Sequence, residues 1–252
     1  MLKTRIVPTL LSKGVGLVKG VAFDSWRRVG TALQSIRVYN LREVDELVFL
    51  DIAATPNGTR PNFQELDELA DNCFMPMTVG GGVKTIDDIR DLLAVGADKV
   101  SINTAAVETP DLIRDGAKEF GAQCIVVAID AKRDANGVLE VMTHCGRNGT
   151  GRHPVEWAKE VEALGAGEIL LTSVDRDGTM RGYDIELVRD VTAVVRVPVI
   201  ASGGCGSYQH MEDLLRFTRA SAVGAASMFH FTEQTPREAK KYLAERGFRV
   251  RL

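Results

Sequence analysis

Residues 75–83 read MPMTVGGGV, a short apolar run that ends in three glycines. Its apolar residues occupy both faces, as in a parallel strand that other elements cover on both sides. Amphipathic stretches with helix signals separate it from seven similar runs: RIVPTLL (5–11), ELVFLD (46–51), KVSIN (99–103), CIVVAID (124–130), EILLTS (168–173), VPVIAS (197–202) and SAVGAA (221–226). Eight strands alternating with helices in 252 residues predict one (β/α)8 barrel, with a doubly wound open sheet as the alternative.

Three local signals predict where helices begin. Thr85 followed by Asp88 resembles a capping box. Pro154 opens a helical stretch that closes at Gly165. Thr109, which precedes a proline, is the predicted N-cap of a further helix.

The two halves of the chain resemble each other. MTVGGGV around Gly81 resembles IASGGCG around Gly204, 123 positions later. KVSINTA resembles AVGAASM at the same spacing, so that Asn103 corresponds to Ala226. The near-constant spacing predicts a barrel made of two duplicated half-barrels, about 1–120 and 121–252.

Composition excludes several classes of protein. The net charge of −3 argues against broad nucleic-acid binding, and no apolar run reaches the roughly 18 residues that span a bilayer. The N-terminus is typical of a first core strand rather than a signal peptide. Four scattered cysteines form no metal-type cluster. We therefore expect a cytoplasmic protein without a metal, a cofactor, or a nucleic-acid or membrane partner.

Two glycine-rich loops predict two phosphate sites. Loops after the strands form the active face of a barrel, and glycines let backbone N–H groups approach an anion closely. One predicted site consists of Gly81, Gly82, Asn103 and Thr104, and the other of Gly178, Gly204, Ala226 and Ser227, with Asp177 on the same rim. Two sites on opposite sides of the mouth suit a ligand with a phosphate at each end. The alternative is that these glycines only make tight turns.

These motifs, together with DELVFLDI, QCIVVAIDAKR and ILLTSVDRDGT, make the chain resemble the cyclase subunit of imidazole glycerol phosphate synthase over nearly its whole length. The resemblance implies a phosphorylated ribulosyl-formimino-carboxamide nucleotide as the type of ligand. It also implies a separate glutaminase subunit that forms a heterodimer with the barrel and supplies ammonia. Two carboxylates, at the ends of strands one and five, carry the cyclase chemistry in that family.

The chain departs from the family at one of these two carboxylates. Asp130 ends the fifth strand as the resemblance requires, but Leu11 stands at the corresponding place in the first strand, where the family has an aspartate. Leucine cannot transfer a proton. The next residue, Ser12, should face the other side of the strand. The resemblance assigns a substrate contact to Lys19, in what we expect to be a flexible glycine-rich loop; a solvated loop charge is the alternative.

The resemblance also assigns a ring of charges to the opposite end of the barrel. It consists of Arg5, Glu46, Lys99 and Glu168, all at strand starts. In the family this ring gates an ammonia passage, and a residue in the position of Asp98 faces the glutaminase. The alternative is a purely stabilising ring, since this end of a barrel usually serves stability.

Three functions are compatible with these features. The first is a diverged synthase subunit that passes ammonia to another chemistry, as in surface-polysaccharide pathways where a third, sugar-modifying amidotransferase is thought to amidinate an acetamido sugar. The second is a genuine histidine-pathway cyclase. The third is a scaffold that activates the glutaminase without doing chemistry.

Overall fold

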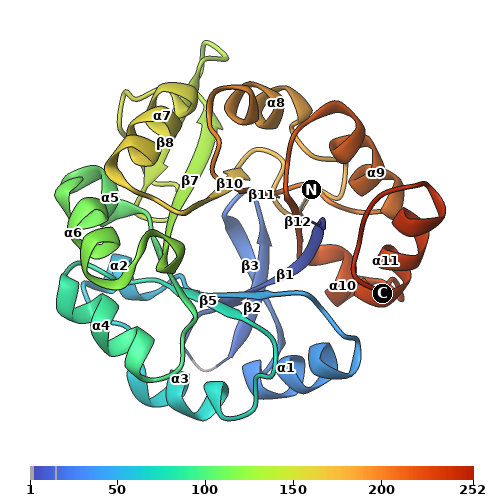
Figure 1. The fold of residues 1–252 in the computed structure, drawn as a ribbon, viewed down its shortest axis with the longest axis horizontal. Helices are drawn as coiled ribbons and strands as arrows, with labels where there is room; N and C mark the ends of the chain where they lie inside the picture. Colours follow the sequence, from blue (N-terminus) through green and yellow to red (C-terminus); the bar gives the residue numbers. More distant parts are fainter. Residues whose placement is uncertain (1–2, 15) are drawn as a thin grey trace.

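Eight parallel strands close into a barrel in the computed structural model, which describes residues 3–14 and 16–252 (Figure 1). Around the barrel each strand pairs with the next, and the last pairs with the first. The strands in this order are β1 (Arg5–Ser12), β4 (Leu47–Asp51), β5 (Met77–Gly80), β6 (Lys99–Ile102), β7 (Ile125–Arg133), β10 (Glu168–Ser173), β11 (Val199–Ser202) and β12 (Ala222–Ala225). The predicted (β/α)8 barrel is confirmed, and the open sheet is excluded.

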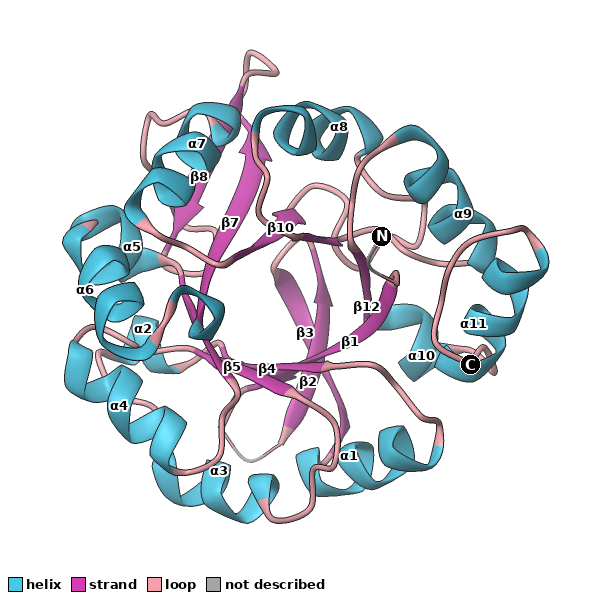
Figure 2. Ribbon diagram, in the orientation of Figure 1, coloured by secondary structure: helices cyan, strands magenta, loops and turns pink. Residues whose placement is uncertain are grey.

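Helices surround this barrel (Figure 2). The long ones are α1 (Ala32–Leu41), α3 (Phe63–Ala70), α4 (Ile86–Ala94), α6 (Asp111–Phe120), α7 (Pro154–Leu164), α8 (Ile185–Val194), α9 (Tyr208–Phe217) and α11 (Pro236–Glu245). The short ones are α2 (Ala54–Asn57), α5 (Thr104–Glu108), α10 (Ser227–Phe231) and the 3₁₀ turn η1 (Ala122–Cys124). No described helix is long and apolar enough to cross a membrane.

Two of the three predicted helix signals are confirmed. Thr85 and Asp88 exchange the hydrogen bonds of a capping box at the start of α4. Pro154 opens α7, which Gly165 ends in the left-handed conformation. The prediction for Thr109 is wrong, because α6 has Pro110 as its N-cap and no side chain caps it.

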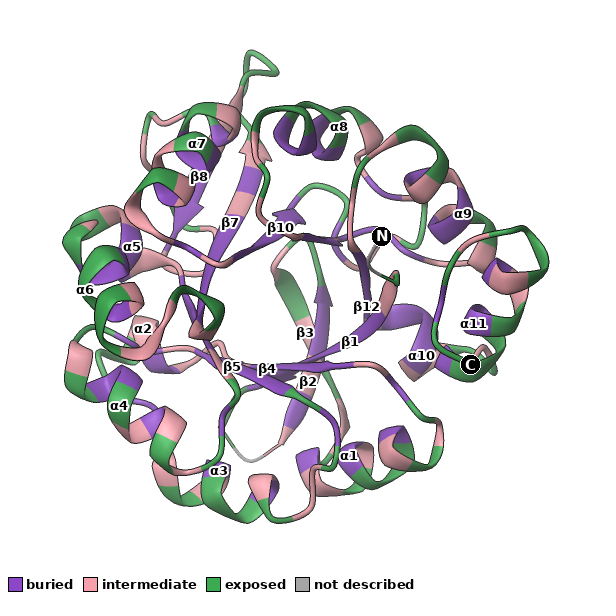
Figure 3. Ribbon diagram, in the orientation of Figure 1, coloured by how far each residue is buried: buried purple, intermediate pink, exposed green. Residues whose placement is uncertain are grey.

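The barrel strands consist mostly of buried residues, whereas the exposed residues gather on the surrounding helices and loops (Figure 3). Above the predicted ring lies a cluster of apolar side chains: Val7, Val48, Val126, Ala128, Leu170, Ile200 and Ala222. Two buried hydroxyl residues, Thr78 and Ser101, pair in register with Val48 and Val126 at the same level. Below it, at the amino ends of the strands, lie the four charges of the predicted ring. Above it, at the carboxyl ends, the lining becomes polar. A small molecule that crosses the barrel must therefore pass a mostly apolar layer between the ring of charges and the carboxyl ends of the strands.

The segment after β1 is a β-hairpin, not the flexible glycine-rich loop expected from the sequence. β2 (Leu17–Val21) pairs antiparallel with β1 and with β3 (Asp24–Gly30). Ala22 and Phe23 connect the two strands with φ angles of 49° and 60°, and positive φ angles at both central residues are typical of a type I′ turn. Such turns usually contain Asn-Gly or Asp-Gly, and neither pair occurs here, so the local sequence carried no hairpin signal.

A second hairpin extends β7. It joins β7 to β8 (Leu139–Thr143), and β9 (Asn148–Gly149) pairs with β8 in turn. The turn lies at Asn136–Gly137, with Gly137 at a φ of 80°. The carboxylate of Asp134 accepts hydrogen bonds from the backbone N–H groups of Asn136 and Val138, both at 2.8 Å, and so fixes the turn.

Candidate functional site

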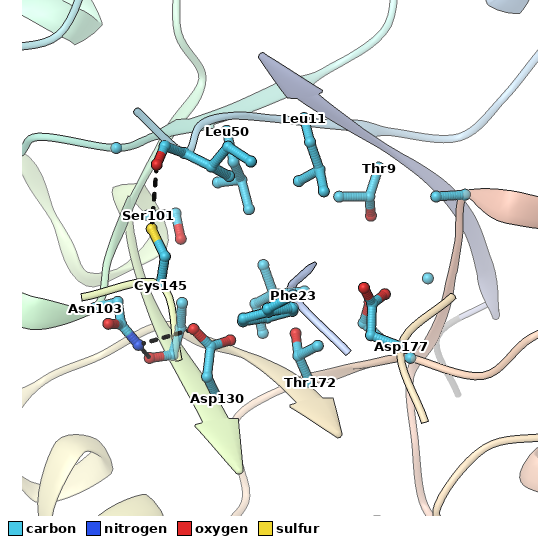
Figure 4. Close-up of a pocket in the computed structure, with 18 of the residues that line it drawn as sticks. Thr9, Leu11, Phe23, Leu50, Ser101, Asn103, Asp130, Cys145, Thr172 and Asp177 are labelled. Atoms are coloured by element: carbon cyan, nitrogen blue, oxygen red, sulfur yellow. Dashed lines mark hydrogen bonds between the residues drawn. The ribbon is translucent and has the colours of Figure 1, made fainter. Parts of the chain in front are cut away.

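A cavity of about 130 Å³ opens at the carboxyl ends of the barrel strands (Figure 4). Its lining includes every residue that the sequence analysis placed at this end: Leu11, Lys19, Gly81, Gly82, Asn103, Thr104, Asp130, Asp177, Gly178, Gly204, Ala226 and Ser227. Residues from all eight barrel strands or their loops thus meet at one mouth.

Asp130 is a carboxyl group that titrates near neutral pH. It lies on β7 and accepts a hydrogen bond from Asn103 Nδ2 at 3.3 Å. Burial raises the pKa of Asp130 to about 7, the charge of Asp177 adds to this, and a hydrogen bond from Thr172 opposes it. Asp130 can therefore give or take a proton at physiological pH.

Leu11 lies on the opposite side of the mouth from Asp130. Three strands lie between β1 and β7 in either direction around the barrel, and both side chains line the cavity. Leu11 is beside Leu50, its register partner on β4. Ser12 does not line the cavity, as the alternation of side chains along a strand requires. The cavity thus receives no titratable group from β1.

Lys19 is buried and ion-paired, so the alternative of a solvated loop charge is wrong. Only 3% of the residue is exposed, and its Nζ lies 2.6 and 2.8 Å from the two carboxylate oxygens of Asp177. The backbone N–H of Ala22 donates to the carbonyl oxygen of Asp177 at 2.8 Å. A Cβ at Gly178 would collide with the carbonyl oxygen of Gly20. The β2–β3 hairpin is therefore packed directly onto the loop that follows β10.

The two predicted phosphate sites have matching backbones. Gly81 and Gly204 have φ angles of 105° and 99°. Asn103 (φ −116°, ψ −81°) and Ala226 (φ −133°, ψ −68°) each precede a five-residue helix. The spacing of 123 residues seen in the sequence therefore relates equivalent backbone geometry at the two sites.

The side chains of the two sites differ in what they contact. Asn103 Nδ2 donates to the carbonyl oxygens of Ala128 and Met142 at 3.0 and 3.3 Å, and Thr104 Oγ1 accepts from the backbone N–H of His144 at 3.0 Å. The buried Oγ of Ser227 has no hydrogen-bond partner among the described residues. A hydroxyl group of the second site is therefore available to a ligand.

The four predicted ring charges form a closed cycle of ion pairs at the amino ends of the strands. Arg5 contacts Glu46 at 2.6 Å, Lys99 contacts Glu46 at 2.9 Å and Glu168 at 2.7 Å, and Arg5 also pairs with Glu168. Burial would raise the pKa of Glu46, but Lys99 and Arg5 outweigh it and hold that pKa below its usual value. Each carboxylate is thus shared by two cations across the barrel axis.

Asp98 has a structural contact at the same end of the barrel. It is exposed, and its Oδ2 accepts the backbone N–H of Met77, the first residue of β5, at 2.8 Å. Asp45 makes the same contact with Ile6 on β1. The interface role assigned to Asp98 stays a prediction.

Among the lining residues that the sequence analysis did not assign, four have side chains of functional interest. Asp51 is the last residue of β4, just as Asp130 is the last residue of the predicted fifth strand, and this position could have identified it from the sequence. Asp51 Oδ1 accepts a hydrogen bond from the backbone N–H of Ala53 at 2.8 Å. Phe23 and Trp26 come from the unexpected hairpin. Cys145, whose pKa is raised to about 11 mainly by burial, follows β8. Within residues 3–14 and 16–252, no group of His, Cys, Asp and Glu is arranged to hold a metal ion.

Comparison with protein families places this architecture among known proteins. A family model described as "Histidine biosynthesis protein" matches residues 5–235. The match begins at the first residue of β1 and ends just before α11, so it includes all eight barrel strands and the whole cavity.

Proposed function

Since the chain belongs to the histidine biosynthesis protein family, we propose that it is a synthase subunit of the cyclase type whose chemistry differs from imidazole ring closure. In this proposal a separate glutaminase binds the amino end of the barrel and supplies ammonia. The ammonia emerges at the mouth and serves the amidination of a sugar in surface-polysaccharide biosynthesis, with a third protein acting on that sugar.

The observation that carries this proposal is Leu11. A paired acid and base need two titratable groups at the reacting atoms, and the mouth offers only Asp130 from the two facing strands. Asp177 is already paired with Lys19. Loss of one member of an acid–base pair costs about 10²–10⁴ in rate, which is a poor match to an essential biosynthetic step.

The interior of the barrel supports transfer of neutral ammonia. The ring charges at the entrance are neutralised pairwise, and the layer above them is mostly apolar. A charged ammonium ion would be desolvated in that layer at high cost, whereas ammonia would not. The layer therefore favours the uncharged nucleophile over the ion.

The amino end of the barrel also carries the features of a protein-binding face. Leu41, Phe74 and Phe217 are 81%, 85% and 61% exposed. They lie at or after the ends of α1, α3 and α9, in connections that lead into strand starts around the ion ring. Large apolar side chains exposed together on one face mark interaction sites.

Replacement of Phe74 tests the pairing with a glutaminase. We expect Phe74→Asp to weaken binding to a glutaminase subunit from the same organism at least about tenfold, because an aromatic anchor dominates such interfaces. The control is Met180→Asp, an apolar residue 36% exposed in the loop after β10 at the opposite end of the barrel, which should leave affinity within about twofold. Isothermal titration calorimetry with purified proteins gives both values. Absence of any complex at micromolar concentrations would refute the proposal.

Two other functions remain as candidates. Family membership favours a genuine cyclase subunit that makes imidazole glycerol phosphate, with Asp130 and Lys19 as its remaining catalytic groups. A scaffold that only activates the glutaminase would need the amino-end face but not the cavity. A carboxylate restored at position 11 tests the cyclase. Ligand binding at the mouth tests the scaffold, which would not need the cavity.

A further inference from the structure

The cavity at the mouth has two unlike walls. Leu11 and Leu50 line one side from β1 and β4, which lie opposite the strands β7 and β10 that carry Asp130 and Thr172. Figure 4 shows the two leucines next to each other, across the cavity from the two polar side chains. An aspartate at position 11 would have made both walls polar.

The hairpin adds two aromatic side chains to the cavity. Phe23 and Trp26 both line the cavity, and the Trp26 ring lies 5.7 Å from the ammonium group of Lys13. Phe23 is held by the type I′ turn and packs over Gly146, where a Cβ would lie 2.9 Å from the phenyl ring. Two aromatic rings and two leucine side chains therefore line the same cavity as the polar side chains of Asp130 and Thr172.

Unpartnered hydroxyl groups mark where a polar end of a ligand would bind. Ser227 is 4% exposed and Thr9 is 9% exposed; both line the cavity, and neither hydroxyl has a hydrogen-bond partner among the described residues. Buried polar atoms are normally satisfied, so these two point to a missing partner. The positive charge of Lys19 is already matched by Asp177, which leaves hydroxyl and backbone N–H groups to hold an anion.

We propose that the mouth binds a phosphate monoester that carries an apolar or aromatic group, with its phosphate at Ser227 and its apolar group against Leu11 and Leu50. The inference rests on the proposed function in treating this mouth as the place where a ligand meets ammonia. In this arrangement Leu11 determines ligand preference. It stands where the family has a proton-transferring aspartate, and its apolar side chain favours ligands that carry an apolar group.

Tryptophan fluorescence tests the preference directly on the full chain. Trp26 lines the cavity, whereas Trp157, the other tryptophan, is buried in α7. The probes are phenyl phosphate and glycerol 3-phosphate, which share the phosphate and differ in the attached group. We expect phenyl phosphate to bind about tenfold more tightly, because its ring buries apolar surface that glycerol lacks.

Three variants assign the two ends of the ligand. Leu11→Ser should reduce the preference for phenyl phosphate to about threefold or less, and Leu11→Met, which conserves volume and polarity, should keep it. Ser227→Ala should weaken both probes by a similar factor, because it acts on the shared phosphate. Thermal melts identify any variant that fails to fold. If Leu11→Ser does not fold, the probe preference of Leu11→Met still tests the contribution of this apolar wall.

Several results would overturn the inference. These are equal affinity for the two probes, a preference unchanged in folded Leu11→Ser, or no saturable binding of phenyl phosphate to the unmodified chain. The titration needs no glutaminase. Failure to form the heterodimer would therefore refute the proposed function and leave this result standing, and the reverse also holds.

Discussion

At the scale of single residues, one side chain decides how the mouth can act. Leu11 and Asp130 occupy facing strand ends of one cavity. Burial brings the pKa of Asp130 to about 7, a value suited to proton transfer, while Leu11 offers only an apolar surface. The mouth therefore combines one carboxyl group of raised pKa with an apolar side chain at the facing strand end.

Restoring the missing carboxylate tests this view. With ammonia and the ribulosyl-formimino-carboxamide nucleotide, we expect little turnover from the unmodified protein and more from Leu11→Asp. The gain is bounded by the roughly 10²–10⁴ of one acid–base group, and misplacement by about 1 Å would reduce it. Product formation is followed spectrophotometrically.

The control for this experiment is Leu11→Asn, which has a similar shape and no titratable proton. Thermal melts of both variants are needed, because a carboxylate buried without a partner destabilises the mouth or becomes neutral. Robust cyclase turnover by the unmodified protein would contradict the proposed function and restore the histidine-pathway cyclase.

At the scale of elements, the β2–β3 hairpin connects the first strand to the far side of the mouth. Lys19 and Asp177 are 158 positions apart in the chain and form a buried ion pair. Arg27 lies over the ring of Phe231 on α10, 3.6 Å from its centroid. The hairpin therefore depends on contacts with β10 and α10 rather than on its own short strands, since an isolated hairpin is marginally stable.

Proteolysis measures how far the ion pair holds the hairpin. Lys19→Met leaves Asp177 buried without its cation, a loss of about 3–5 kcal/mol for a buried pair. Local opening should therefore rise, and trypsin should cut after Arg27 or Arg28 at least about tenfold faster. Lys132→Met, in the other hairpin, is the control. Equal cleavage rates in all three proteins would mean that other contacts hold the hairpin.

At the scale of the whole molecule, the barrel joins two ends with different tasks. The amino end has a closed ion ring and exposed apolar side chains, and the carboxyl end has the cavity. The matched backbones at Asn103 and Ala226 are what duplicated half-barrels would produce. The division near residue 120 stays a prediction.

The ion ring should stabilise the barrel as a unit. Glu168→Gln removes the negative charge that Arg5 and Lys99 share, and we expect the free energy of unfolding to fall by about 2–4 kcal/mol, because the remaining charges stay partly buried. The control is Glu160→Gln, whose partner Arg152 is on the surface, with an expected loss below about 1 kcal/mol. Urea denaturation gives both values. A similar loss in both variants would show that the ring contributes no more than a surface pair.

The sequence by itself determined the eight barrel strands, both glycine loops, and the positions of Leu11 and Asp130. Strand periodicity and the 123-residue repeat are local or regular features, and a closed parallel barrel brings all strand ends to one face. Only the tertiary structure decided that Lys19 pairs with Asp177 and that Phe23 turns into the mouth. The ion pair joins segments far apart in the chain, and the turn lacks the glycine that would have announced it.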